Sequence, residues 1–129
     1  MYYKWAECNL RLNDVENAAV HAYGLWIGED ELSVAQVATA TGLTLGELKI
    51  RVKPLVEALR NIDVMKMDCE GCEWTLLTTP CDYLRSVTEY VVEIRGPKLP
   101  IIRKMEKCGF KPQLIRRLHP LLTVWHFSL

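Results

Sequence analysis

The segment Lys66–Trp74, which reads K-M-D-C-E-G-C-E-W, holds the most informative group of reactive side chains. It contains three carboxylates, those of Asp68, Glu70 and Glu73, within six residues. Carboxylates this close repel one another unless a helix N-terminus, a ligand hydroxyl or amine, or a metal ion offsets their charge. Asp68 is therefore the first candidate for a carboxylate that contacts a ligand, and Glu70 is the second. For Glu73, a place in the first turn of a helix is a sufficient explanation.

Cys69 and Cys72 in the same segment have the C-x-x-C spacing found in zinc sites and redox sites. A zinc site needs four ligands, and the sequence has no second C-x-x-C and no matched histidine pair, so we predict no metal site. A redox pair stays open as an alternative, although the intervening Glu-Gly is no strong signal for one. Because a chain of this size does not need disulfides to fold, we interpret the five cysteines as free thiols in a reducing compartment.

A strand and a helix must position these carboxylates. The apolar run Ile62–Met67 predicts a strand that ends at Asp68, and Glu70–Leu77 predicts a short helix after it. A second strand is predicted over Thr88–Ile94. In open α/β sheets, ligands bind beyond the carboxyl ends of the strands, so Glu93, near the end of the second strand, is the third candidate.

The N-terminal part has a less uniform pattern. Ala18–Ile27 predicts a buried strand, and residues 32–41 fit a helix or a strand about equally. Thr44 and Glu47 have the spacing of a capping box and predict a helix there, with a kink or a fresh start at Pro54. A helix before these elements is indicated by an apolar face with spacings of three and four, formed by Trp5, Cys8, Leu12 and Val15.

The C-terminal part predicts a helix and a hairpin. Pro100–Cys108 has proline in its first turn and Gly109 as a left-handed cap. Gln113–Leu118 and Leu121–Leu129 predict two antiparallel strands. The alternation of helices and strands over residues 1–129 indicates a single α/β domain, with a mostly parallel sheet that ends in this antiparallel hairpin.

Composition excludes several classes of protein. The 129 residues are 50% hydrophobic and 25% charged, which excludes a disordered chain, collagen and a coiled coil. Sixteen Lys and Arg balance sixteen Asp and Glu, so the overall charge gives no argument for binding to nucleic acid or membranes. No run is long and apolar enough to cross a bilayer, and we expect a soluble, cytoplasmic protein with no membrane partner.

The ordered motifs of the chain resemble those of one enzyme family. Lys66–Glu73 is similar to the K-(I/M)-D-(hydrophobic/Cys)-E-G-x-E signature of the FkbM-type S-adenosylmethionine-dependent methyltransferases. This resemblance covers nearly the whole chain and implies a Rossmann-like fold, methyl transfer to a hydroxyl oxygen, and S-adenosylmethionine as cofactor. If methyl transfer occurs, the catalytic candidates are the carboxylates at the strand ends, Asp68 first, Glu70 second and Glu93 third. Other pieces that agree in order are residues 9–17, Thr44-Leu45, Tyr90–Ile94 and Gly109-Phe110.

One part of the family pattern is missing from this sequence. The family begins with a strand and a glycine-rich loop that holds the cofactor, whereas the 129 residues contain no G-x-G-x-x-G. On the family's strand order, 3-2-1-4-5-7-6, the two absent central strands would lie between Ala18–Ile27 and Ile62–Met67. We therefore expect a truncated Rossmann-like methyltransferase sheet, the C-terminal part of the enzyme only, with no cofactor-binding residues to assign.

Loss of the two central strands would leave the Ile62–Met67 strand with unpaired backbone groups. The Ala18–Ile27 strand could pair with it directly, a second copy of the chain could pair edge to edge, or a separate polypeptide could supply the missing half. The last two solutions imply a homo-oligomer or a complementing chain. The chain would then be inactive alone and would be completed by its partner.

Two interpretations from other classes stay open. Residues 33–53 can form a helix-turn-helix that binds DNA through Lys49, Arg51 and Lys53. Charge is also uneven, because residues 1–94 hold 8 basic and 15 acidic side chains whereas residues 95–129 hold 8 basic and 1 acidic. A protein that binds an acidic partner is therefore the second interpretation, with a contact surface formed by Arg103, Lys104, Lys107, Lys111, Arg116 and Arg117.

Overall fold

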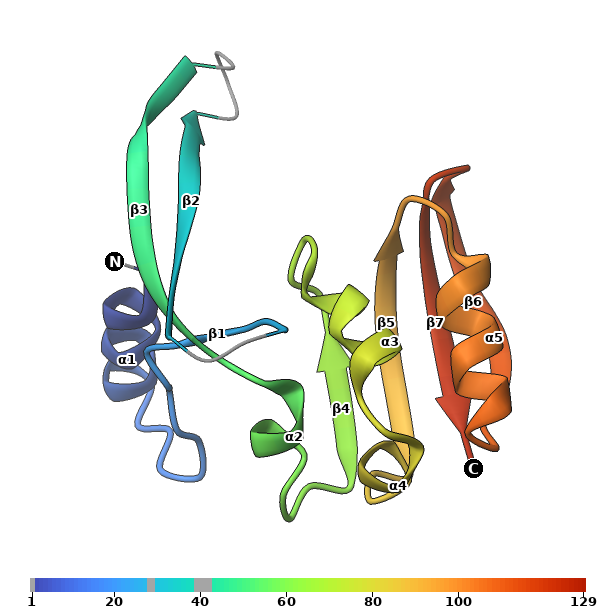
Figure 1. The fold of residues 1–129 in the computed structure, drawn as a ribbon. Helices are drawn as coiled ribbons and strands as arrows, with labels where there is room; N and C mark the ends of the chain where they lie inside the picture. Colours follow the sequence, from blue (N-terminus) through green and yellow to red (C-terminus); the bar gives the residue numbers. More distant parts are fainter. Residues whose placement is uncertain (1, 28–29, 39–42) are drawn as a thin grey trace. The chain divides into compact units, whose positions relative to one another are not determined.

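The computed structural model describes residues 2–27, 30–38 and 43–129 and divides the chain into two compact units. Unit 1 combines Met1–Gly24 with Glu31–Arg51, and unit 2 combines Leu25–Asp30 with Val52–Leu129. Helices and strands alternate along the chain, which makes it a mixed α/β protein (Figure 1). The interpretation of residues 1–129 as one domain stays a prediction. None of the helices in the described part of the chain has the length and apolar character that crossing a membrane requires.

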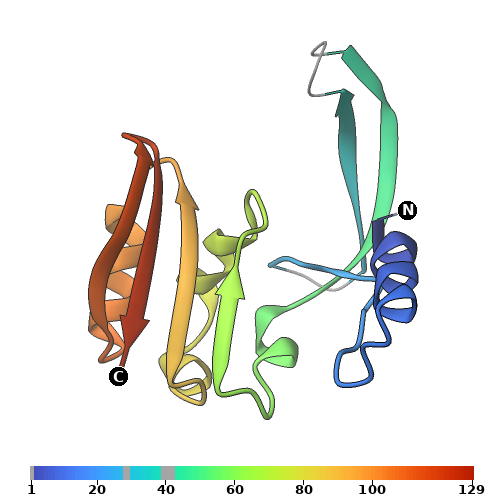
Figure 2. The same cartoon turned by 180° about the vertical axis from the view of Figure 1, so that it is seen from behind.

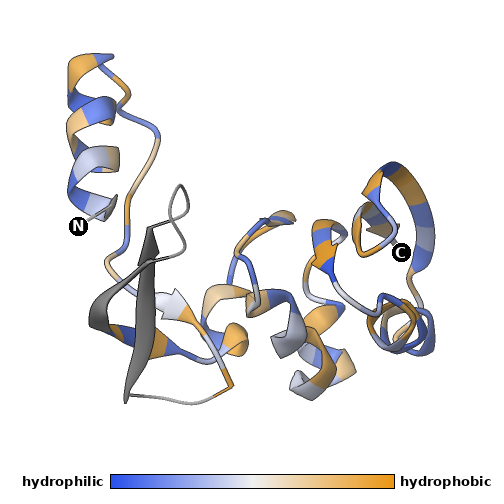
Figure 3. Cartoon of the chain, turned by 90° about the horizontal axis from the view of Figure 1, so that it is seen from above, coloured by the Kyte–Doolittle hydropathy of each residue, from blue (hydrophilic) through white to orange (hydrophobic). Residues whose placement is uncertain are grey.

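Unit 1 begins with helix α1 (Tyr2–Leu12), which ends where the Asn13 side chain donates to the carbonyl of Asn9 at 2.8 Å. Hydrophobic and hydrophilic residues both follow the length of α1 (Figure 3), and the large apolar side chains of the predicted face, Trp5 and Leu12, are exposed. The three strands that follow α1 along the chain form a sheet in the order β1, β3, β2. Their bounds are Gly24–Leu25 for β1, Leu43–Lys53 for β3 and Asp30–Ala38 for β2.

The helix predicted to start at Thr44 is wrong, because this stretch belongs to strand β3. From Leu48 to Lys53 apolar and charged residues alternate strictly, which is the period of a strand. A capping box stabilises a helix end through only one or two local hydrogen bonds, and pairing with both β1 and β2 outweighs it. The fresh start at Pro54 is confirmed, because helix α2 (Leu55–Ala58) begins directly after it.

The structure also tests the predictions made for residues 18–27 and for residues 32–41. The strand predicted over Ala18–Ile27 is wrong except at β1, because only Gly24–Leu25 within this run is assigned to a strand. Within the ambiguous run 32–41, the residues up to Ala38 form strand β2, and the others lie outside the described residues. Because β2 and β3 are extended, the helix-turn-helix interpretation of residues 33–53 is wrong, and with it the DNA-binding helix.

Unit 2 contains a four-stranded sheet in the order β4, β5, β7, β6, which is the order expected for the last four strands of the family sheet. β4 pairs with β5 in parallel, whereas β7 lies antiparallel to both β5 and β6. The predicted strands and the C-terminal hairpin are confirmed, and the sheet is mixed, because β4 and β5 are parallel whereas β7 runs antiparallel to both of its neighbours. The bounds are Val64–Met67 for β4, Glu89–Arg95 for β5, Lys111–His119 for β6 and Leu122–Ser128 for β7.

The helices after β4 lie on one face of this sheet, as Figures 1 and 2 show from opposite sides. Residues 70–77, predicted as one helix, form the short 3-10 helix η1 (Cys72–Trp74) followed by α3 (Thr75–Thr78). Helix α5 (Leu99–Lys107) confirms the helix predicted over residues 100–108, and its cap Gly109 has the expected left-handed backbone, with a φ of 97°. Helix α4 (Cys81–Leu84) is not indicated by the sequence pattern.

The core of unit 2 lies between this face of the sheet and the helices. Alternate residues of β5, namely Tyr90, Val92 and Ile94, are fully buried, whereas Val91 and Glu93 between them are half-buried. Each fully buried side chain of this size stabilises the fold by about 2 kcal/mol. The helices contribute Leu76, Ile101 and Met105 to the same core, and β7 contributes Phe127.

Four of the five cysteines form disulfides, so the interpretation of all five as free thiols is wrong. The pairs are Cys69–Cys72 and Cys81–Cys108, and Cys8 is free. Cys81 begins α4 and Cys108 follows α5, and the fold brings their Cα atoms to 5.0 Å, within the usual range for a disulfide. Spacing along the sequence does not reveal this proximity, because it arises only when the two helices pack.

Tyr90 generates a prediction about stability and pH. Its hydroxyl donates to the carbonyl of Leu84 at 2.9 Å, and burial raises the pKa of the phenol far above its usual value. The neutral phenol therefore favours folding below about pH 10, the pKa of an unfolded tyrosine, and this contribution declines as the pH rises further. We predict that Tyr90→Phe lowers the free energy of unfolding by about 1 kcal/mol at pH 7 and weakens its decline above pH 10.

Urea denaturation at a series of pH values measures both effects. Tyr83→Phe is the matched control, because the Tyr83 side chain is exposed. An alkaline decline in stability that is equally steep in the wild type and in Tyr90→Phe contradicts the prediction.

Candidate functional site

The predicted site residues lie at one edge of the sheet in unit 2. β4 and β5 are parallel, and Met67 at the end of β4 pairs with Val92 near the end of β5. The carboxyl ends of the two strands therefore lie side by side. Asp68 and Glu70 follow β4, and Glu93 lies near the end of β5, so the expectation that the three share this edge agrees with the strand register.

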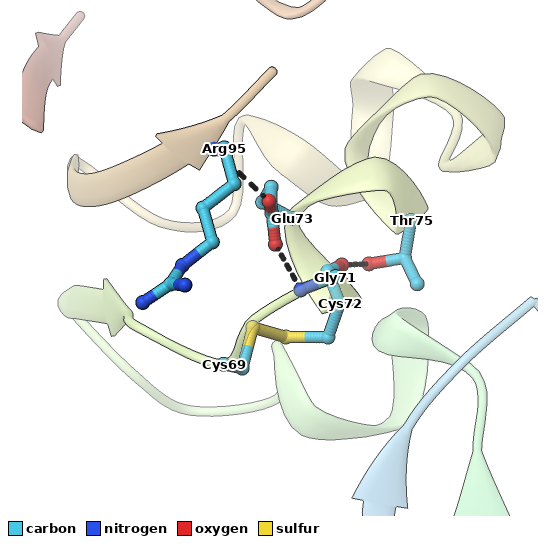
Figure 4. The surroundings of a disulfide bond; sticks show 6 residues. All are labelled: Cys69, Gly71, Cys72, Glu73, Thr75 and Arg95. Carbon is cyan, nitrogen blue, oxygen red and sulfur yellow. Dashed lines mark hydrogen bonds between the residues drawn. A yellow bond between two sulfur atoms is a disulfide. The ribbon is translucent and has the colours of Figure 1, made fainter. Parts of the chain in front are cut away.

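Glu73 is the most constrained carboxylate at this edge. Its side chain is fully buried, one carboxylate oxygen accepts the N–H of Gly71 at 2.7 Å, and the other accepts the N–H of Arg95 at 3.2 Å (Figure 4). Glu73 thus ties the loop after β4 to the end of β5, 22 residues further along the chain. A place in the first helical turn does not explain this role. The local signal is a carboxylate followed closely by large apolar residues, namely Trp74, Leu76 and Leu77.

Arg95 connects two of the predicted site residues, although the sequence does not single it out. Its Nη2 lies 2.9 Å from Oε1 of Glu70, and its Nε lies 3.3 Å from Oε1 of Glu93. The Glu70 side chain is 70% exposed and that of Glu93 is 17% exposed. One guanidinium therefore offsets the repulsion between two carboxylates. The available signal was the spacing of Glu93 and Arg95, since alternate residues of a strand face the same side.

Asp68 is held more weakly than the other carboxylates. Its Oδ2 lies 3.1 Å from Nζ of Lys66, and its side chain is 45% exposed. An exposed ion pair of this kind contributes at most about 1 kcal/mol to stability. A ligand hydroxyl can replace the ammonium at little cost, so Asp68 is open to an incoming ligand and, unlike Glu70 and Glu93, is not paired with Arg95.

The loop that carries these residues has a defined backbone. Glu70 and Gly71 have positive φ angles of 52° and 136°, and the Cys69–Cys72 disulfide spans them (Figure 4). A left-handed backbone is uncommon for glutamate and common for glycine. The hydroxyl of Thr75 donates to the carbonyl of Cys72 at 2.6 Å, which fixes the end of the loop at the start of η1.

The described residues include no group of three His, Cys, Asp or Glu side chains arranged to hold a metal ion. The carboxylates of the site instead have cations or backbone N–H groups as partners. The basic residues that could bind an acidic partner belong to α5 and β6, and β6 is the edge of the sheet opposite β4.

A family model described as a methyltransferase domain matches residues 7–108, which is most of the chain. The chain belongs to this family of methyltransferase domains. The match includes Asp68, Glu70, Glu93 and Arg95, so the methyltransferase domain contains the whole of the edge described above. Searches of curated proteins and of solved structures find no match.

Glu73 generates the second prediction for this methyltransferase domain. In Glu73→Gln an amide NH2 replaces one carboxylate oxygen and faces an N–H group that then has no acceptor. We predict that this change lowers the free energy of unfolding by about 2 kcal/mol, the usual size for a hydrogen bond to a charged group.

The matched control is Glu70→Gln, which makes the same chemical change three residues earlier at an exposed position. We expect that control to change the free energy of unfolding by less than about 0.5 kcal/mol. If urea denaturation shows the same loss in the free energy of unfolding for both variants, the buried hydrogen bonds of Glu73 do not explain the effect of Glu73→Gln.

Proposed function

We propose that this methyltransferase domain carries the acceptor side of an FkbM-type O-methyltransferase that uses S-adenosylmethionine, and that a second chain completes the enzyme. The resemblance of Lys66–Glu73 to the family signature supports the subtype, and the family match supports the methyltransferase class. On this proposal Asp68, Glu70 and Glu93 are the catalytic carboxylates. Nucleic acid is not the substrate that the geometry favours.

The free edge of β4 carries the proposal of a second chain. Among the described strands β4 pairs with β5 alone. The carbonyl of Asp63 accepts N–H groups from Thr88 and Glu89 and so points toward β5. Because backbone groups alternate along a strand, those of Val64 and Lys66 point to the unpaired side. In the family order, strand 1 would pair with strand 4 at this edge.

The residues of this chain do not by themselves fit S-adenosylmethionine. The family holds the cofactor in a loop with several close glycines, which lets the backbone approach the ligand. Here Gly71 and Gly96 are the glycines that follow β4 and β5, and each stands alone in the sequence. We therefore assign no cofactor-binding residue to this chain, and on the proposal the second chain supplies the cradle.

The chain's own contribution is to bind and activate the acceptor. Asp68 accepts a hydrogen bond from the acceptor hydroxyl and takes its proton, which makes the oxygen a stronger nucleophile. Arg95 lies between Glu70 and Glu93 and reduces their mutual repulsion, so both carboxylates stay at this edge and can accept further hydroxyl groups. Such an arrangement suits an acceptor with more than one hydroxyl.

Cofactor binding and molecular mass together test whether a second chain completes the enzyme. We predict that calorimetric titration of the isolated chain with S-adenosylmethionine gives no micromolar binding, because the cradle is absent. Light scattering then tests for a second copy: twice the chain mass of 14.8 kDa indicates that two copies associate, and the single mass excludes completion by a second copy. Stoichiometric micromolar binding by a monomer would overturn the proposal.

The edge itself is tested with a matched pair of variants. Val64→Pro removes an N–H from the unpaired side of β4, whereas Val64→Ala shortens the same exposed side chain and keeps the N–H. Association through this edge is lost in the proline variant and kept in the alanine variant. If both variants associate equally, the partner binds elsewhere.

Asp68→Asn tests the catalytic assignment. We predict that this variant folds with a free energy of unfolding within about 1 kcal/mol of wild type, because it loses only an exposed ion pair, and that the completed enzyme loses its methyltransferase activity. Urea denaturation and methyl transfer to the acceptor are the two measurements. A variant that fails to fold would give Asp68 a structural role instead.

A further inference from the structure

We propose that the Cys69–Cys72 disulfide is a site of thiol–disulfide exchange, which an external dithiol opens while Cys81–Cys108 stays closed. Cys69 is exposed, whereas Cys72 at the start of η1 is only 8% exposed. An attacking thiolate can therefore reach the sulfur of Cys69, and Cys72 is the leaving sulfur. Exposed disulfides are the labile ones in proteins, and buried structural ones resist reduction.

The second disulfide, Cys81–Cys108, differs from the first in its burial and in the size of the loop that it closes. Cys108 is fully buried and Cys81 is partly buried against the core, so a reductant reaches this pair less readily than it reaches the exposed Cys69. The two bridges also close loops of different size, with sequence separations of 3 and 27. The longer loop restricts the unfolded chain more, so the Cys81–Cys108 bridge contributes more to the stability of the fold than Cys69–Cys72 does.

The backbone inside the small loop also favours opening. Glu70 and Gly71 lie between the two cysteines and both have left-handed φ angles. The Cys72 end is fixed, because the hydroxyl of Thr75 donates to the carbonyl of Cys72 and the N–H of Trp74 donates to that of Gly71. When the bridge opens, the Cys69 end is therefore the one that moves, and Glu70 can leave its unfavourable backbone conformation.

The exchange reaction is balanced by the dithiol itself. A thiolate of the dithiol attacks Sγ of Cys69, a mixed disulfide forms, and Cys72 leaves as a thiolate that takes up a proton. The second thiol of the reagent then attacks the mixed disulfide, forms a cyclic disulfide and releases the thiolate of Cys69, which is protonated in turn. Two electrons pass from the dithiol to the protein, and the reverse sequence closes the bridge.

The position of the bridge links its redox state to the candidate site. Cys69 lies between Asp68 and Glu70, so movement of the Cys69 end displaces both carboxylates from the edge where Arg95 holds Glu70. Reduction would therefore lower methyl transfer by the completed enzyme. This consequence rests on the proposed function, whereas the exchange site itself does not.

The order of reduction tests the exchange site without any assay of activity. The folded protein is equilibrated with increasing concentrations of dithiothreitol, free thiols are trapped by alkylation, and peptide mass spectrometry reports each cysteine. We expect Cys69 and Cys72 to become alkylated together at dithiothreitol concentrations about tenfold or more below those that open Cys81–Cys108. If both bridges open together, or Cys81–Cys108 opens first, the proposal is wrong.

A pair of single variants tests which sulfur is attacked. In a Cys8→Ser background, Cys72→Ser leaves Cys69 as the free thiol and Cys69→Ser leaves Cys72. We expect Cys69 to form a mixed disulfide with an aromatic disulfide reagent about tenfold or more faster than Cys72, because only Cys69 is exposed. Equal rates, with both variants folded by circular dichroism, would contradict the proposal. Where one variant does not fold, the reduction series on the wild-type chain decides alone.

Discussion

The edge of the sheet depends on one buried carboxylate. β4 and β5 are parallel and are separated by more than twenty residues, and the ladder between them ends at the pair Met67 and Val92. Glu73 spans this gap, because its two oxygens accept N–H groups from the loop after β4 and from Arg95. A buried carboxylate is costly without such donors, so the loop, the start of η1 and the end of β5 must keep these positions together.

The position of Arg95 follows from this constraint. Its N–H is bound by Glu73, so its side chain starts from a fixed point, and its guanidinium contacts Glu70 and Glu93 from there. Two of the three candidate carboxylates thus share one cation, which the backbone holds in place. Asp68 has only the exposed Lys66 as partner, which separates its role from that of the other two. All of these carboxylates lie at the same edge of the sheet. They differ because Arg95, the partner of Glu70 and Glu93, is held through its backbone N–H, whereas Lys66, the partner of Asp68, is exposed.

The parts of the fold that the sequence predicts are those with a local cause. β4, β5, α5 with its cap Gly109 and the C-terminal hairpin follow from apolar periodicity and turn residues within each segment. The candidate carboxylates are chosen by the rule that ligands bind at the carboxyl ends of strands, and their catalytic role stays a prediction. The Glu73–Arg95 contact and the Cys81–Cys108 bridge join residues more than twenty positions apart, and no local pattern encodes them. At β3 a local signal is misleading. The capping-box spacing of Thr44 and Glu47 predicts a helix, but strand alternation and pairing with two neighbouring strands make this stretch extended.

The burial of residues along β4 shows which part of this edge is packed by other residues of unit 2. Met67 at its carboxyl end is buried, whereas Val64 at its beginning is 57% exposed. The end that carries Asp68 is therefore settled by contacts within unit 2, and the edge along the strand is open in the described sheet. On the proposed function, this divides the enzyme into two tasks. The acceptor carboxylates are already positioned here, since Glu73 and Arg95 need no partner to hold them, and the completing chain has only to add strands and the cofactor cradle beside them.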